Sequence, residues 1–166
     1  MILAIDPGTA KSAWCVFDGL KVVDCDIDPN KVVRAKLMSL DLSGYRVAIE
    51  MIASYGMPVG KEVFETCVWI GRFMEVVLSS TDCAGCSLVY RKDVKMHLCS
   101  SARAKDANIR QAIIDRFEPT GGGKVPQIGT VKQPGPLYGV SSDIWAALGV
   151  AITFHDTKML PIGNKG

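Results

Sequence analysis

The stretch Ile2-Leu3-Ala4-Ile5-Asp6-Pro7-Gly8 predicts a buried β-strand that ends in a tight turn. Four apolar residues precede an Asp-Pro-Gly sequence, and these three residue types are common turn formers after a strand. Asp6 therefore allows two interpretations. Its side chain shapes the turn before Pro7, or it is the first acid of a functional site at the end of the strand.

Strand and helix patterns alternate along the rest of the chain. We expect strands over 2–5, 12–17, 20–27, 46–50 and 86–90, with Asp18-Gly19 as a hairpin turn. Helices are expected from Pro29 to about residue 40, over 61–78, from Asp106 as N-cap to Phe117, and over 144–154. Residues 118–140 are rich in Gly and Pro and predict a long loop, with a flexible stretch at Gly121-Gly122-Gly123-Lys124. This order predicts an α/β fold with a mixed five-stranded sheet flanked by helices.

Length and composition are those of one globular domain. The 166 residues fit a domain over 1–156, followed by a flexible tail over 157–166 that begins to fray at Asp156. Hydrophobic residues make up 48% and charged residues 22%, which excludes a disordered chain. No apolar run approaches the ~18 residues of a membrane span, and the N-terminus lacks a signal-peptide pattern. We therefore expect a cytoplasmic protein whose six cysteines are reduced thiols.

The net charge of +2 does not by itself indicate nucleic acid, but basic residues cluster locally. Between positions 91 and 110 two acids are outnumbered by six basic residues, namely Arg91, Lys92, Lys95, Arg103, Lys105 and Arg110. Lys124 and Lys132 lie in the loop, which has no acid between Gly121 and Ser142. Local basic surface suits a DNA backbone, although a solvated charged face is the simpler interpretation of this feature alone.

Two further acids give Asp6 a chemical context. Glu50 ends the apolar run Val47-Ala48-Ile49, and in a sheet of this kind the first and fourth strands are neighbours. Two carboxylates so close are unfavourable unless a cation lies between them, and Mg²⁺ prefers carboxylate, water and phosphate oxygens. Asp143 begins the last helix, where it is either a third acid of the site or a plain N-cap.

Four stretches, in the family's order, resemble the RuvC-type Holliday junction resolvases. They are the opening strand with Asp6-Pro7-Gly8, the strand Ala48-Ile49-Glu50, the basic segment 89–95 with Ala104-Lys105-Asp106, and Asp143 with 148–153. Each motif is weak alone, but together they span most of the chain. The resemblance implies an RNase H-like fold and a structure-selective, metal-dependent endodeoxyribonuclease that acts in DNA recombination and repair.

The same resemblance implies roles for individual residues. Asp6, Glu50 and Asp143 would be catalytic and would bind two Mg²⁺ ions, for which Mn²⁺ can substitute. Lys95 and Lys105 match basic positions of the family and would hold DNA phosphate. The remaining candidates for DNA contact are Arg91, Lys92, Arg103, Arg110 and Tyr55. Tyr55 follows Glu50 where the family presents a wedging or stacking residue, although core packing or a loop contact is its simpler role. Symmetric nicking of a four-way junction implies a homodimer.

The chain departs from the family at the last helix. RuvC-type enzymes have a second acid one turn after the first, and Ala146 stands at that place here. The sequence therefore identifies no fourth metal ligand. The Gly/Pro-rich loop is also longer than in cellular members, which favours a phage-type or divergent member in a bacterial or phage-infected cytoplasm.

Other functions remain as alternatives. One is a broader nuclease of forks and flaps, and another is a junction-binding protein with weakened catalysis. A sugar-kinase-like phosphotransferase shares an early acidic turn but needs two such domains, for which the chain is too short. Gly121-Gly122-Gly123-Lys124 lacks the spacing of a phosphate-binding loop. Zinc binding by Cys83, Cys86, His97 and Cys99 is not favoured, because one residue separates the last two.

Overall fold

A mixed sheet forms the centre of the molecule, for which the computed structural model describes residues 1–81 and 83–159. Its strands are β1 (Ile2–Pro7), β2 (Lys11–Phe17), β3 (Val22–Pro29), β4 (Arg46–Met51) and β5 (Cys86–Tyr90). The order across the sheet is β3-β2-β1-β4-β5. The first three strands form antiparallel hairpins, whereas β4 and β5 run parallel to β1. The expected mixed five-stranded sheet is therefore confirmed.

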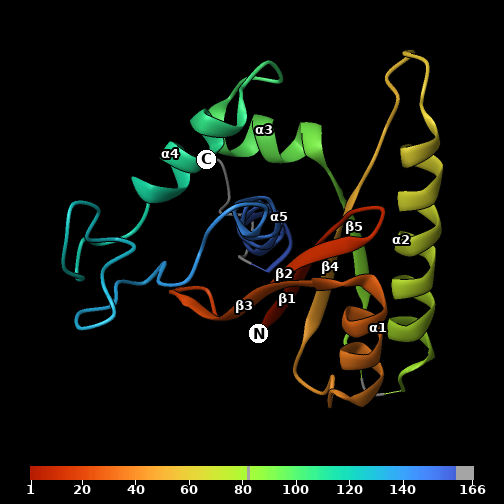
Figure 1. Cartoon of the computed structure of the whole chain (residues 1–166), viewed down its shortest axis with the longest axis horizontal. Coiled ribbons are helices and arrows are strands. Elements are labelled where there is room, and N and C mark those ends of the chain that lie inside the picture. The colour runs from red at the N-terminus through yellow and green to blue at the C-terminus, as the bar shows by residue number, and fades with distance from the viewer. Residues whose placement is uncertain (82, 160–166) are drawn as a thin grey trace, which may run out of the picture.

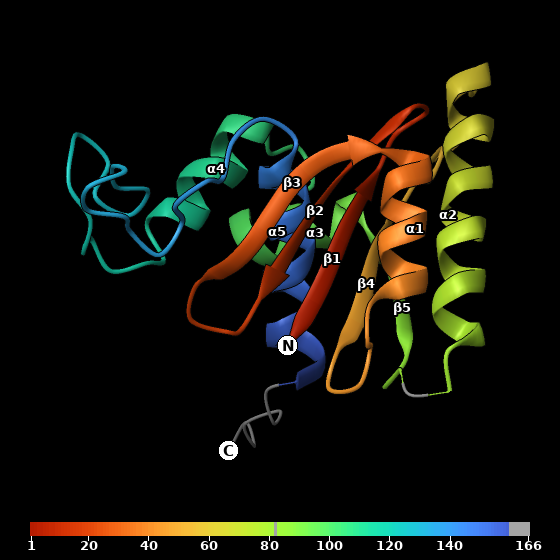
Figure 2. The same ribbon diagram turned by 60° about the horizontal axis from the view of Figure 1, so that its bottom comes forward.

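Helices cover both faces of this sheet (Figures 1 and 2). One face carries α1 (Asn30–Ser39) and α2 (Lys61–Ser79), and the other carries α3 (Arg91–Cys99), α4 (Asp106–Ile114) and α5 (Ile144–Phe154). A π-helical turn, η1 (His155–Met159), continues α5. No helix within the described ranges has the length and hydropathy needed to cross a bilayer.

Strand alternation separates two hydrophobic cores. Successive residues of a strand point to opposite faces, so Ile2, Ala4 and Ala48 pack on the α5 side while Leu3, Ile5 and Ile49 pack on the α1 and α2 side. Every residue of α5 except Ala146 is buried. Asp6 and Glu50 each come two positions after an alanine of the α5 side. Both carboxylates are therefore directed to the face that α5 covers.

Several element boundaries differ from the expectation. Pro29 is the last residue of β3 and the N-cap of α1, so the helix begins at Asn30 and not at the proline. Asn30 is buried and fixes this corner, because its amide accepts a hydrogen bond from Ser12 Oγ at 2.6 Å and donates one to the Gly8 carbonyl at 2.8 Å. Lys105, not Asp106, is the N-cap of α4, and that helix ends before Phe117.

The Gly/Pro-rich segment 118–140 is a long loop, as expected, and it is held by its own backbone hydrogen bonds, including one at Gly122 where a flexible stretch was expected. Gly122 N–H donates to the Gln133 carbonyl at 2.9 Å, and Gly135 N–H donates to the Ile128 carbonyl at 3.0 Å. The Gly121 backbone also lies close to the loop's other arm, since a Cβ there would lie 2.5 Å from the Pro126 carbonyl oxygen. Glycines are needed here because the two arms of the loop approach too closely for side chains.

The expected fraying from Asp156 is wrong, because this residue is anchored. The Asp156 carboxylate accepts from Arg116 Nη2 at 2.6 Å and lies 2.7 Å from His97 Nε2 and 3.1 Å from His155 Nδ1. Residues 157–159 continue the helical backbone in η1. The rest of the proposed tail, 160–166, lies outside the described residues.

Candidate active site

The carboxyl groups of Asp6 and Glu50 meet at the carboxyl ends of β1 and β4. The two strands are parallel, with Ile5 paired to Ile49, so the acids occupy the next position of each strand. A side-chain hydrogen bond joins the two groups. The juxtaposition that the sequence predicted for these two acids is therefore present.

This pair is electrostatically unfavourable when both groups are ionised. Burial, the hydrogen bond to Glu50 and the repulsion by the Glu50 charge together raise the pKa of Asp6 from 3.8 to about 9. The negative charge of Asp143 acts in the same direction, and the positive charge of Arg91 acts against it. At neutral pH a proton on Asp6 therefore relieves the repulsion that a bound cation would otherwise relieve.

Asp143 directly precedes α5, as the N-cap of that helix. Its side chain, however, makes no capping hydrogen bond. A capping role for the carboxylate, the simpler interpretation of the sequence, is thus not observed. The carboxylate is exposed, and its effect on Asp6 puts it within electrostatic reach of the pair. Ala146 follows within the first turn, where its N–H donates to the Asp143 carbonyl.

Arg91 is the cation of this site. It is the first residue of α3, directly after β5, and its side chain is only 29% exposed. Nη1 lies 3.4 Å from Glu50 Oε1, and Nη2 donates to Asp106 Oδ1 at 2.5 Å. Sequence reasoning assigned Arg91 to DNA phosphate and Asp106 to a helix cap, and it missed the contact of both with the acidic site.

The reason for that omission is that α3 itself was not expected. Its sequence, Arg-Lys-Asp-Val-Lys-Met-His-Leu-Cys, is mostly polar, and Val94 is its one fully buried residue. A helix with so narrow an apolar stripe has a weak periodic signal. The signal that would have found the contact is the pairing of β4 with β5, which aligns Met51 with Tyr90 and thereby brings Arg91 beside Glu50.

Tyr55 and Lys92 form an exposed aromatic and basic pair on this side of the molecule. Tyr55 lies in the loop between β4 and α2, is 61% exposed, and has a left-handed backbone with φ of 48°. Lys92 Nζ lies 5.7 Å from the centre of the Tyr55 ring. A left-handed conformation is costly for a tyrosine, so the loop holds the ring in solvent at the expense of local strain.

The other basic residues proposed to contact DNA lie along α3 and α4 and in the segment between them. Arg103, Lys105 and Arg110 are exposed, and Lys95 is half-buried. The Arg110 guanidinium lies 5.1 Å from the centre of the Trp145 ring, in the first turn of α5 after Asp143. The structure thus brings Asp6, Glu50 and Arg91 together and places Asp143 near them. The remaining basic candidates lie on or beside α3 and α4, the helices on the same face of the sheet.

The donor atoms of the three acids suit a hard divalent cation, since carboxylate oxygens are the preferred protein ligands of Mg²⁺ and Mn²⁺. Within residues 1–81 and 83–159, however, no three His, Cys, Asp or Glu side chains stand close enough to form a ready-made metal site. The unfavourable Asp6–Glu50 pair fits a cation site in chemistry. A metal site with all three carboxylates requires Asp143 to come closer to Asp6 and Glu50.

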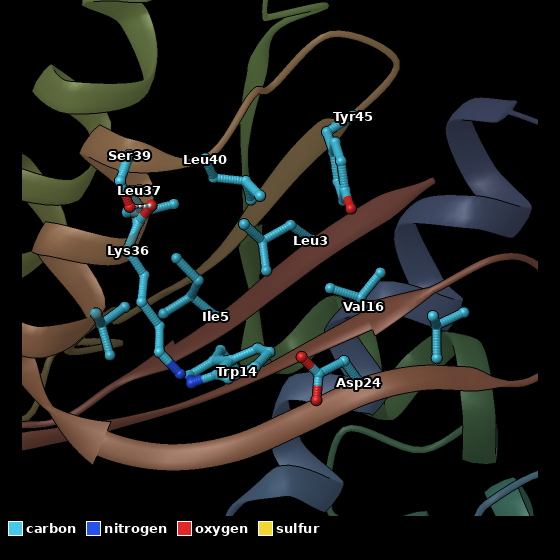
Figure 3. Close-up of a pocket in the computed structure, with 12 residues that line it drawn as sticks. Leu3, Ile5, Trp14, Val16, Asp24, Lys36, Leu37, Ser39, Leu40 and Tyr45 are labelled. Carbon is cyan, nitrogen blue, oxygen red and sulfur yellow. Dashed lines mark hydrogen bonds between the residues drawn. The ribbon is translucent and has the colours of Figure 1, made fainter.

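An apolar pocket of about 420 Å³ lies on the opposite face of the sheet, between α1 and the strands (Figure 3). Leu3, Ile5 and Trp14 form its floor, and Lys36 lies 4.2 Å from the centre of the Trp14 ring. Leu3 and Ile5 point to the face of β1 opposite the one that carries Asp6. The pocket is therefore separate from the acids, and the chemistry of the site belongs to the open α5 side.

Comparison with solved structures shows the fold of RuvC. The chain is similar to Thermus thermophilus RuvC, with a TM-score of 0.63, 12% sequence identity, and coverage of 93% of this chain and 94% of that one. It is also similar to T. thermophilus RuvC in complex with a Holliday junction substrate, with a TM-score of 0.61, 11% identity, and coverage of 92% and 90%. No family model and no curated protein matches the sequence. The RNase H-like fold, and the likeness of this fold to that of RuvC, are thus confirmed.

Proposed function

We propose that this protein is a metal-dependent endodeoxyribonuclease that resolves four-way DNA junctions by paired nicks. The observation that carries the proposal is the Asp6–Glu50 pair, which is half-buried, mutually repulsive and within electrostatic reach of a third acid, Asp143. Two adjacent carboxylates do not stabilise a fold that binds no cation. A nuclease that uses divalent cations to cut a phosphodiester, in contrast, needs such a pair of carboxylates to bind them.

In this proposal Asp6, Glu50 and Asp143 hold the metal. A divalent cation at such a site activates a water and stabilises the leaving 3′-oxygen of a phosphodiester. The acids provide oxygen donors of the right kind. The family resemblance implies two Mg²⁺ or Mn²⁺ ions.

The basic residues would hold the DNA backbone. Lys95, Lys105, Arg103 and Arg110 lie on or beside α3 and α4, the helices on the acidic face of the sheet. Contacts of Lys and Arg with phosphates supply affinity without reading sequence, which suits recognition of a DNA shape. Tyr55, with Lys92 over its ring, offers an exposed aromatic surface for an unpaired base at a branch point.

A homodimer follows from the same proposal, because a four-way junction has two equivalent strands to cut. On α2, three large apolar side chains are exposed on one stripe: Phe64 at 62%, Val68 at 52% and Leu78 at 63%. A second copy of the chain, packed through this stripe, would bury them. Sedimentation of the wild type and of Phe64→Glu tests this point, with a dimer expected only for the wild type.

Two other functions share the observations. A broader nuclease of forks and flaps would use the same acids and basic helices. A junction-binding protein with weakened catalysis is favoured by Ala146, the small residue in the first turn of α5. Comparing the cleavage of a junction, a fork and a plain duplex by the same preparation distinguishes a junction-selective enzyme from the broader nuclease. Loss of measurable cleavage in Asp143→Asn excludes the second.

The direct test of the proposal is cleavage of a synthetic four-way junction with and without Mg²⁺. We expect paired nicks that require the metal and are abolished by Asp6→Asn. Asp24→Asn is the matched control, because Asp24 is exposed on β3, two strands away from Asp6. Failure to cut any branched DNA in either Mg²⁺ or Mn²⁺ contradicts the proposal.

A further inference from the structure

Arg91 gives the acidic site a permanent positive charge. Its guanidinium lies against Glu50 at 3.4 Å and is held on its other edge by Asp106 at 2.5 Å. Arginine stays charged in proteins, and this side chain is mostly covered, so its charge acts at short range with little screening. Asp106 is 84% exposed, and water therefore screens its charge far more effectively.

The charges of the site match one divalent ion. When a bound cation takes the place of the proton on Asp6, the three acids Asp6, Glu50 and Asp143 carry a formal charge of minus three. The Arg91 guanidinium beside Glu50 reduces this charge to minus two. One divalent cation neutralises this set. A site with a fourth acid at position 146 and no arginine would carry minus four and would need two cations.

We propose that Arg91 supplies the positive charge that a second divalent ion would otherwise bring, so that this site binds one ion where four-acid sites bind two. The inference rests on the proposed function, since it concerns the same three acids. Ala146 and Arg91 both make the site less negative, because position 146 has no acid and position 91 has a fixed positive charge.

The geometry gives Arg91 a second property that a mobile ion lacks. Because Asp106 fixes one edge of the guanidinium, the other edge stays beside Glu50 before any metal or DNA arrives. Glu50 is thus oriented in advance. Arg91 is in this sense a positioning residue for the metal site, and its effect on metal binding is measurable without any cleavage.

The experiment counts Mn²⁺ ions bound to the full chain, from the electron paramagnetic resonance signal of free Mn²⁺ during a titration. We expect one ion per chain for the wild type and for Arg91→Lys, which keeps the charge. Arg91→Gln should bind its ion at least about tenfold more tightly, because the loss of one repelling charge outweighs the loss of the orienting contact with Glu50. Arg91→Gln combined with Ala146→Asp should bind two ions. Arg72→Gln, on α2 over the Trp69 ring, is the control and should match the wild type.

Two ions bound to the wild type with similar affinity overturn the inference but leave the proposed nuclease intact. Unchanged Mn²⁺ affinity in folded Arg91→Gln also overturns it. Absence of Mn²⁺ binding in the wild type removes the metal site itself and with it both proposals. Should Arg91→Gln fail to fold, the Mg²⁺ dependence of wild-type cleavage decides: first order supports one ion, and second order contradicts it.

Discussion

The Asp6 and Glu50 carboxyl groups lie on adjacent parallel strands and share a hydrogen bond. Burial, this hydrogen bond and the charge of Glu50 together raise the pKa of Asp6 to about 9. Because the pKa is higher in the fold than the ordinary 3.8, the folded chain binds this proton more tightly than the unfolded chain. The stability that the proton contributes is complete below about pH 4 and is lost as the pH rises towards 9.

Asp6→Asn should therefore stabilise the metal-free protein, because asparagine is neutral at every pH. The gain should be near zero at pH 4 and about 1–3 kcal/mol at pH 8, the scale of an unfavourable buried polar group. Mg²⁺ should raise the melting temperature of the wild type and leave that of Asp6→Asn unchanged. Thermal unfolding in a chelator at pH 4, 6 and 8 measures this. A wild type and a variant with parallel pH dependence would rule out the charge conflict at Asp6.

Lys105→Gln should weaken DNA binding in a salt-dependent manner. Lys105 is exposed at the start of α4, and one lost phosphate contact lowers the slope of log K against log salt by about 0.9. Lys21→Gln is the control, since Lys21 follows β2 at the end of the sheet opposite Asp6. Binding of a junction is measured by fluorescence anisotropy at several salt concentrations. Equal slopes for the two variants would remove Lys105 from the DNA surface.

Tyr55→Asn should reduce junction affinity by about 5- to 150-fold, which corresponds to the 1–3 kcal/mol of one stacked base. Asparagine tolerates the left-handed backbone at this position, so the loop conformation should survive. The melting temperature should hardly change, because the Tyr55 ring is 61% exposed. Tyr138→Asn, at a tyrosine 44% exposed in the Gly/Pro-rich loop, is the control. Stacking fails as an explanation if both variants bind the junction equally well.

Gly121→Ala should lower stability more than Gly122→Ala. A Cβ on Gly121 would lie 2.5 Å from a backbone oxygen of Pro126, whereas one on Gly122 would meet the movable Gln133 side chain at 3.0 Å. Overpacking against backbone costs about 1–3 kcal/mol, and a side chain can rotate away at lower cost. Chemical denaturation of both variants gives the comparison. A loop that tolerates both alanines equally would not have the close backbone approach described here.

The parts of the fold that sequence predicted are those with strong local signals. β1, β4 and α5 have continuous apolar runs, and the acids at their ends could be named because each interrupts such a run. Helix α3 was missed because its one fully buried residue, Val94, leaves no periodic stripe. Local pattern therefore located Asp6, Glu50 and Asp143 individually.

What local pattern did not show was how distant residues combine. The contact of Arg91 with Glu50 depends on the register of β4 against β5 and on a helix starting directly after β5. The anchoring of Asp156 depends on His97 and Arg116, which are distant in sequence. In both cases the partner is set by tertiary packing, which no single stretch of sequence encodes.

Metal-dependent cleavage of four-way DNA junctions is the function proposed for this chain. This cleavage is measured most directly with a supercoiled plasmid that extrudes a cruciform, incubated with the protein and Mg²⁺. Paired nicks across the junction convert the plasmid to a linear form, and Asp6→Asn should leave it supercoiled. A plasmid that remains supercoiled with folded wild-type protein, in Mg²⁺ and in Mn²⁺, would contradict the claim.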